Sequence, residues 1–133
     1  MTNRNRSGLP LACLVLALVG ALAAESAAKP AHEISPQQAR SQQQAGDDLV
    51  FVDVRTPEEF ASGRVPGAVN IPVGQLSSRL TELGKDDRLV VYCERGPRAA
   101  LAADTLLGAG YTDVSHLTGD MAGWRAAGLP IEK

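Results

Sequence analysis

Short apolar segments recur along the chain and are separated by stretches that carry helix signals. Four of these segments, at 49–54, 68–71, 89–92 and 114–117, each contain valine together with another large apolar residue. The segments at 49–54 and 89–92 are almost continuously apolar, as is typical of strands buried on both faces of a parallel sheet. The pattern therefore predicts four short strands.

Two helix starts are marked by a hydroxyl residue followed by proline, a combination typical of an N-cap and a first helical turn. Ser35 and the proline after it predict a glutamine-rich helix that ends near Gly46. Thr56 and its proline predict a second helix, in which Glu59 completes a capping box.

Three further helices are expected. Leucines at helical spacing predict one over 75–83, and another follows the 89–92 strand and ends near the glycines at 108 and 110. We expect Asp120 to cap a terminal helix that contains Trp124. Because strands alternate with helices, the sequence predicts an α/β domain with a small, mainly parallel sheet flanked by helices on both faces.

The N-terminal segment has the layout of a secretory signal peptide. Arg4 and Arg6 precede an apolar stretch that is shorter than the roughly 20 residues needed to span a bilayer, and small residues follow it. We therefore expect a signal peptide over 1–23, a tether over 24–33 and one domain over 34–133, in an exported, periplasmic protein. An uncleaved signal that anchors the protein in the inner membrane is the alternative.

Length and charge narrow the function classes. The chain has 133 residues, a length that suits one small monomeric domain once a signal is removed, and its formal net charge is −2. It has no basic stripe and no series of aromatic residues, so a nucleic-acid partner is not expected. It also has no glycine-rich nucleotide fingerprint, and we expect no cofactor.

The two cysteines differ in their expected fate. Cys13 lies in the predicted signal peptide, which leaves Cys93 as the single thiol of the mature chain and excludes an intramolecular disulfide. An unpaired thiol in an exported protein indicates that it is retained for its reactivity. One cysteine and two separated histidines make no metal-ligand cluster, so no metal site is expected.

Cys93 follows the predicted 89–92 strand and opens a loop that contains Gly96 and Pro97 before the next helix. The N-terminus of a helix carries free N–H groups and a partial positive charge, which favour a thiolate and an anionic substrate. Ligands of parallel sheets bind at the carboxyl ends of the strands, where this loop is placed. The alternative is a buried core cysteine at the end of a strand.

Three separated segments resemble the rhodanese (thiosulfate:cyanide sulfurtransferase) family, in its single-domain form. They are 53–72, which begins Asp-Val-Arg-Thr-Pro-Glu-Glu-Phe, the loop at 93–98, and 117–130, which contains Thr-Gly-Asp-Met-Ala-Gly-Trp. The chain departs from the usual family pattern at Gly63-Arg64-Val65, in place of Gly-His-Ile, and at Gly119-Asp120, in place of Gly-Gly. Neither departure supplies the nucleophile.

The resemblance implies that Cys93 takes a sulfane sulfur from a small-molecule donor such as thiosulfate and forms a persulfide. Cyanide, a thiol or a small thiol protein would then accept the sulfur. The resemblance and the loop chemistry together imply a substrate site whose backbone N–H groups cradle the sulfur and whose Arg98 pairs with an oxyanion. The expected substrate-binding residues are Glu94, Arg95, Gly96, Arg98 and Ala99. The charge of Glu94 opposes a thiolate unless its side chain points outward.

Two other functions stay open. The domain would be a sulfur carrier or a partner-binding module without turnover, or a phosphatase or arsenate reductase of the same fold. The second class uses a C-x5-R loop, whereas Arg98 lies five positions after Cys93 and makes a tighter C-x4-R loop. Outside the loop, we interpret Asp53 and Arg55 as structural and His116 as a polar surface position.

Overall fold

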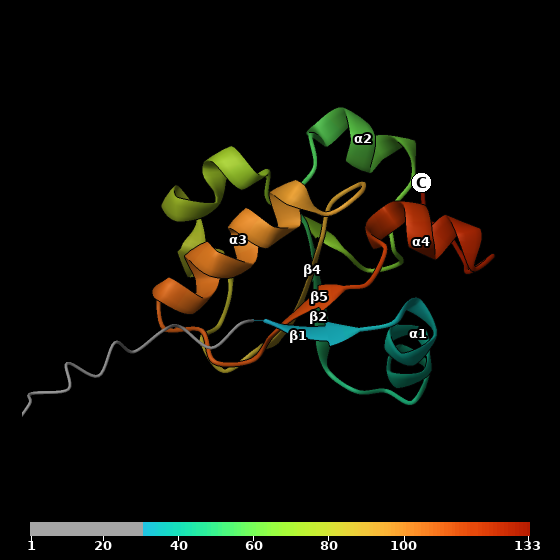
Figure 1. Cartoon of the computed structure of the whole chain (residues 1–133), viewed down its shortest axis with the longest axis horizontal. Coiled ribbons are helices and arrows are strands. Elements are labelled where there is room, and N and C mark those ends of the chain that lie inside the picture. Colours follow the sequence, from blue (N-terminus) through green and yellow to red (C-terminus); the bar gives the residue numbers. More distant parts are fainter. Residues whose placement is uncertain (1–30) are drawn as a thin grey trace, which may run out of the picture.

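The computed structural model describes residues 31–133, which form a five-stranded sheet surrounded by helices (Figure 1). The predicted signal peptide, Cys13 and most of the expected tether lie outside these residues. The strands pair in the order β1-β5-β4-β2-β3, and every pair is parallel. They are β1 (His32–Ile34), β2 (Leu49–Asp53), β3 (Val69–Asn70), β4 (Arg88–Tyr92) and β5 (Val114–Leu117). The α/β fold with a parallel sheet is confirmed.

The four α-helices are α1 (Pro36–Gln44), α2 (Pro57–Ser62), α3 (Pro97–Gly108) and α4 (Asp120–Ala126). Both predicted N-caps form, and each is part of a capping box, although only the one at Thr56 was predicted. The hydroxyl of Ser35 accepts the N–H of Gln38, and that of Thr56 accepts the N–H of Glu59. Each satisfies N–H groups that the first helical turn leaves free, so the two helix starts are placed by local chemistry.

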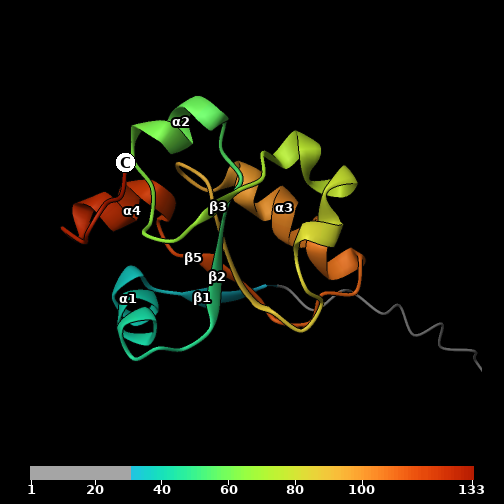
Figure 2. The ribbon, with the colours of Figure 1, turned by 180° about the vertical axis from the view of Figure 1, so that it is seen from behind.

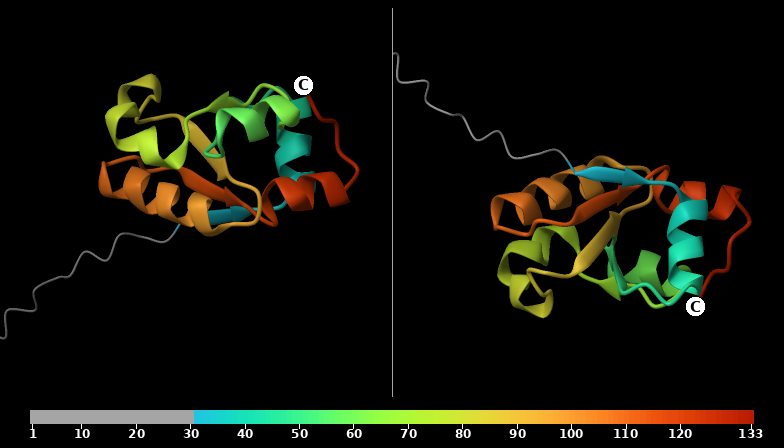
Figure 3. Two further views of the ribbon diagram at one scale, coloured as in Figure 1. Left: turned by 90° about the horizontal axis from the view of Figure 1, so that it is seen from above. Right: turned by 90° about the horizontal axis from the view of Figure 1, so that it is seen from below.

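Each face of the sheet has its own apolar core, and different helices cover the two faces (Figures 2 and 3). Helix α3 packs on one face together with the segment between β3 and β4, and Leu76 and Leu106 are fully buried there. Helices α1 and α4 pack on the other face, where Trp124 contacts Phe51 edge to face. Covering both faces leaves the carboxyl edge of the sheet as the place for a site.

The segment predicted as a helix over 75–83 instead forms two short 3-10 helices, Val73–Ser78 and Leu80–Glu82. Its start has no side-chain cap, and Gly74 and Ser77 are poor helix formers. The leucine spacing still reports burial correctly, because Leu76 and Leu83 are buried. A helical prediction from apolar spacing alone was therefore wrong in type and right about the buried face.

Strand β1 was not predicted, and its first two residues fall within the expected tether. It extends the sheet by pairing with β5, and only Ile34 of its residues is buried. A three-residue strand with two exposed polar positions has no apolar pattern to mark it. Of the helices in residues 31–133, none has the length and apolar character needed to cross a membrane.

Candidate active site

Cys93 lies at the carboxyl end of β4, a strand flanked by β2 and β5, and is 1% exposed. Its thiol is unpaired. Gly96 is the N-cap of α3 and has φ +125°, a conformation that L side chains rarely adopt. Pro97 follows as the first residue of the helix. The predicted strand, loop and helix around Cys93 are therefore all present.

The sulfur of Cys93 accepts a hydrogen bond from the backbone N–H of Gly96, with an N–Sγ distance of 3.0 Å. Within residues 31–133 this is the one backbone N–H that donates to Sγ. The sequence had led us to expect several backbone N–H groups around the sulfur. Sγ lies beside the first turn of α3, where the helix dipole favours a negative charge.

Arg98 lies in that first turn and is bound to a carboxylate from another helix. Its two terminal nitrogens lie 2.7 and 3.0 Å from the two carboxylate oxygens of Glu59 in α2. This ion pair lowers the pKa of Glu59 to about 2. Partial burial raises that pKa and so opposes the shift, whereas the hydrogen bond from the Thr56 N–H lowers it further. Glu59 thus caps α2 and also links α2 to the first turn of α3 through Arg98. An anionic substrate would compete with Glu59 for Arg98.

The other expected substrate-binding residues differ in their surroundings. Arg95 is exposed and makes no hydrogen bond or ion pair within the described part of the chain, whereas Ala99 is buried under the loop. Glu94 is paired with two arginines, Arg55 at 3.2 Å and Arg125. These cations offset the Glu94 charge that opposes a thiolate.

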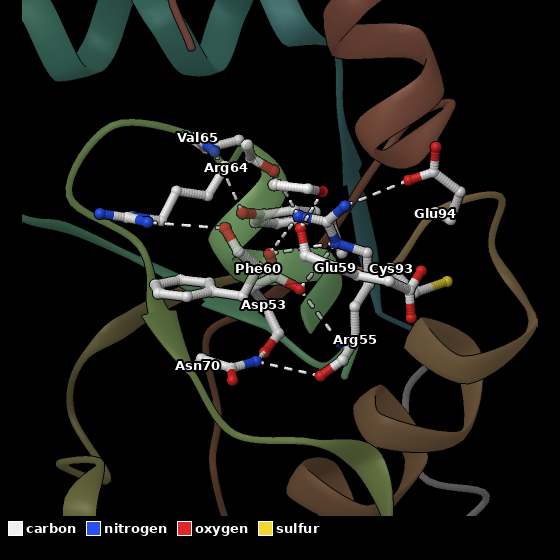
Figure 4. A network of polar contacts seen from close by, with 12 residues as sticks. Asp53, Arg55, Glu59, Phe60, Arg64, Val65, Asn70, Cys93 and Glu94 are labelled. Atoms are coloured by element: carbon white, nitrogen blue, oxygen red, sulfur yellow. Dashed lines mark hydrogen bonds and ion pairs between the residues drawn. The ribbon is translucent and has the colours of Figure 1, made fainter. Parts of the chain in front are cut away.

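A buried ion pair lies beside the cysteine loop and is linked to it through Glu94 (Figure 4). Arg55 and Asp53 are fully buried, and their closest nitrogen and oxygen atoms are 2.7 Å apart. The same guanidinium donates to the carbonyl of Gly63 and reaches Glu94 in the cysteine loop. Arg55 therefore joins the end of β2, the end of α2 and the loop, which agrees with the structural role expected for it.

The expected capping role of Asp120 was wrong. The N-cap of α4 is Gly119, and Asp120 is the first helical residue, 3% exposed. Its Oδ1 accepts the backbone N–H of Cys93 at 3.0 Å and lies 3.6 Å from the sulfur. Asp120 is also the one non-glycine residue with positive φ in residues 31–133. The carboxylate is thus aimed at the cysteine.

His116 contacts the same carboxylate oxygen through its Nε2, at 2.9 Å. The hydrogen bond to Asp120 raises the pKa of His116 above its ordinary value, although partial burial opposes this, and the charges of Asp120 and Glu33 assist. His116 had been interpreted as a polar surface position. The one sequence signal toward this cluster was the departure from Gly-Gly at Asp120.

The N-terminus of α4 is fastened to the cysteine loop by its backbone as well. The N–H of Met121 donates to the carbonyl of Cys93 at 2.9 Å, and the N–H of Ala122 donates to that of Glu94 at 3.1 Å. A Cβ at Gly96 would lie 3.3 Å from Asp120 Oδ2, so glycine also allows this close approach. Loop and helix therefore form one rigid wall of the site.

Comparisons with known proteins agree on one family. The sequence model of the Rhodanese-like domain matches residues 35–127. The chain is 38% identical over 120 residues to an HTH-type transcriptional regulator of Mycobacterium tuberculosis, which covers 89% of this chain and 52% of that protein. It thus spans about half of that relative's length.

A second relative is named for an enzymatic activity. A protein of Allochromatium vinosum named sulfurtransferase is 39% identical over 85 residues, or 64% of this chain and 79% of its own length. Among solved structures, a rhodanese-related protein of Thermoplasma volcanium superposes with a TM-score of 0.68 at 26% identity, over 76% of this chain and 97% of that one.

Proposed function

The chain belongs to the Rhodanese-like domain family, and from this premise we propose that it is a sulfurtransferase that carries sulfur as a persulfide on Cys93. The observation that supports this best is the setting of the thiol. It is unpaired, it sits at the start of α3, and its sulfur accepts the Gly96 N–H. A thiolate is stabilised by both the hydrogen bond and the helix dipole.

In the first half-reaction, the Cys93 thiolate attacks the outer sulfur of a sulfane donor such as thiosulfate. A bond forms between Sγ and that sulfur, and the bond to the sulfonate group breaks, so sulfite leaves with its electron pair. The N–H of Gly96 is placed to hold negative charge on the sulfur throughout this exchange.

In the second half-reaction, cyanide, a thiol or a small thiol protein attacks the outer sulfur of the persulfide. The bond to Cys93 breaks, and its electron pair returns to Sγ as a thiolate. Each half-reaction uses one substrate at one nucleophile, so ping-pong kinetics are expected. No metal or cofactor takes part in this scheme.

Cations around the loop would receive the oxyanion of the donor. Arg95 is exposed and unengaged among the described residues, so it is available to an approaching anion. Arg98 reaches a donor only by sharing or releasing Glu59, its present partner. The C-x4-R spacing of Cys93 and Arg98, one residue shorter than the C-x5-R loop of phosphatases of this fold, weighs against the phosphatase alternative.

Intact mass after incubation with thiosulfate tests the proposal. We expect the wild type to gain one sulfur atom, Cys93→Ser to gain none, and added cyanide to restore the original mass. An unchanged wild-type mass with several sulfane donors would refute it. Turnover of an aryl phosphate without sulfur loading would favour the phosphatase alternative, and loading without discharge to any acceptor would favour a carrier.

We also propose export of the protein through removal of residues 1–23, with an uncleaved membrane anchor as the alternative. N-terminal sequencing of the protein recovered from the periplasm distinguishes the two. A mature chain that starts shortly after residue 23 supports export with cleavage, and an intact N-terminus in a membrane fraction supports the anchor. Size-exclusion chromatography tests the expected monomer.

A further inference from the structure

One carboxylate oxygen of Asp120 faces three groups of the active-site wall. Oδ1 lies 3.0 Å from the Cys93 nitrogen, 3.6 Å from the Cys93 sulfur and 2.9 Å from His116 Nε2. An ionised carboxylate only accepts hydrogen bonds. Its contact with the sulfur is therefore an S–H···O bond when Cys93 is a thiol, and a pair of adjacent negative charges when Cys93 is a thiolate.

The adjacent charges are unfavourable unless a cation balances them. Besides Cys93, His116 is the one titratable side chain that touches Asp120 in the described part of the chain, and it comes from β5. The other charged groups facing this cluster are Glu33 on β1, beside His116, and Arg98 on α3, whose guanidinium is paired with Glu59. Within residues 31–133, His116 is thus the group that can become a cation beside Asp120 as Cys93 loses its proton.

We propose that Asp120 and His116 form the proton-transfer pair of Cys93, in which Asp120 takes the thiol proton and His116 holds it. The proposal rests on the sulfur chemistry proposed above and adds two residues to it. Asp120 touches the reacting atom and is a catalytic residue, and His116 acts through Asp120 and is a positioning residue.

The transfer balances without any further reactant. In the Nδ1–H tautomer of neutral His116, Nε2 has a free electron pair. The S–H bond of Cys93 breaks, the electron pair stays on sulfur, and the proton passes by way of Asp120 Oδ1 to that free pair, so that the imidazolium then donates its Nε2–H to the carboxylate. The products are a thiolate, a carboxylate and an imidazolium, with the same net charge as before. When a sulfur acceptor later releases Cys93 as a thiolate, the proton returns from His116 and the resting thiol is restored.

The rate of alkylation by iodoacetamide, measured against pH, tests the pair because that rate follows the thiolate fraction. His116→Gln keeps a hydrogen-bond donor toward Asp120 but cannot carry charge. Since an uncompensated neighbouring charge changes an ionisation equilibrium by about tenfold, we expect alkylation at pH 7 to slow by about that factor. Asp120→Asn keeps an oxygen for the Cys93 N–H and removes the negative charge, so its profile should move toward lower pH.

Opposite displacement of the two profiles supports the proposal, because loss of packing would not move them in opposite directions. A His116→Gln profile that superposes on the wild type, or profiles displaced in the same direction, would overturn it. Circular dichroism verifies that each variant is folded. Alkylation needs no sulfur donor, so wild type that shows these profiles but never loads sulfur would refute only the proposed function.

A measurement that leaves both residues intact covers the case of a variant that does not fold. The imidazole proton resonances of His116 are followed by NMR over pH in the wild type and in Cys93→Ala. Because the two ionisations are coupled, the wild type should show a second inflection where the thiol ionises, and Cys93→Ala should lack it. Identical titration curves would contradict the proposal. Normal sulfur loading with identical curves would refute this inference alone.

Discussion

Replacing Glu59 by glutamine isolates the ion pair that ties α2 to the helix after Cys93. Glutamine keeps a side-chain oxygen for the N–H of Thr56, so the capping box of α2 is preserved. It removes the negative charge that faces the guanidinium of Arg98 at 2.7 and 3.0 Å. The substitution therefore changes one electrostatic contact and little else.

The pKa of Glu59 gives the size of the effect. Its value of about 2, against an ordinary 4.5, corresponds to about 3 kcal/mol of preferential interaction with the ionised side chain. The side chains of Arg98 and Glu59 are 35% and 33% exposed, and solvent screens such a pair. We therefore expect Glu59→Gln to lower the free energy of unfolding at pH 7 by about 1–2 kcal/mol.

The same reasoning predicts how the effect depends on pH. The folded-state pKa of Glu59 is lowered, so its stabilisation is complete above 4.5 and is lost as the pH falls toward about 2. Urea unfolding of wild type and Glu59→Gln at pH 7 and pH 3 measures this. The difference between the two proteins should shrink at the lower pH.

Glu58 provides the matched control for this experiment. It is an exposed acid in the first turn of the same helix and makes no ion pair within the described residues. Glu58→Gln should cost only the helix-dipole contribution, about 0.5 kcal/mol. Equal losses for the two variants at pH 7, or a Glu59→Gln effect that is the same at both pH values, would refute the reasoning.

Two further substitutions test the packing around the loop. Gly96→Ala strains a residue with φ +125° and places a Cβ 3.3 Å from Asp120 Oδ2. We expect the free energy of unfolding in urea to fall by about 1–2 kcal/mol and sulfur loading to weaken. Gly74→Ala serves as the control, because no atom lies within 4 Å of its Cβ. Arg55→Met leaves Asp53 as a buried charge without its main partner and should cost about 3–5 kcal/mol, and a loss below about 1 kcal/mol would contradict the ion-pair role.

Several features of the fold and site are encoded locally and could be predicted from the sequence. A capping box depends on residues three positions apart, so Ser35 and Thr56 mark their helices without tertiary help. The apolar run before Cys93 and the Gly-Pro pair after it determine a strand, a tight loop and a helix start. The place of Cys93 at the edge of the sheet follows from this short stretch.

Other features depend on contacts between distant residues, and only the tertiary structure decided them. Glu59 and Arg98 are 39 positions apart, and Asp120 is 27 positions from Cys93, so no local pattern relates them. The sheet order brings β5 beside β4 and thereby sets Asp120 against the sulfur, with His116 in contact with Asp120. Local spacing can identify a candidate nucleophile, but the charged groups around it are set by which strands become neighbours.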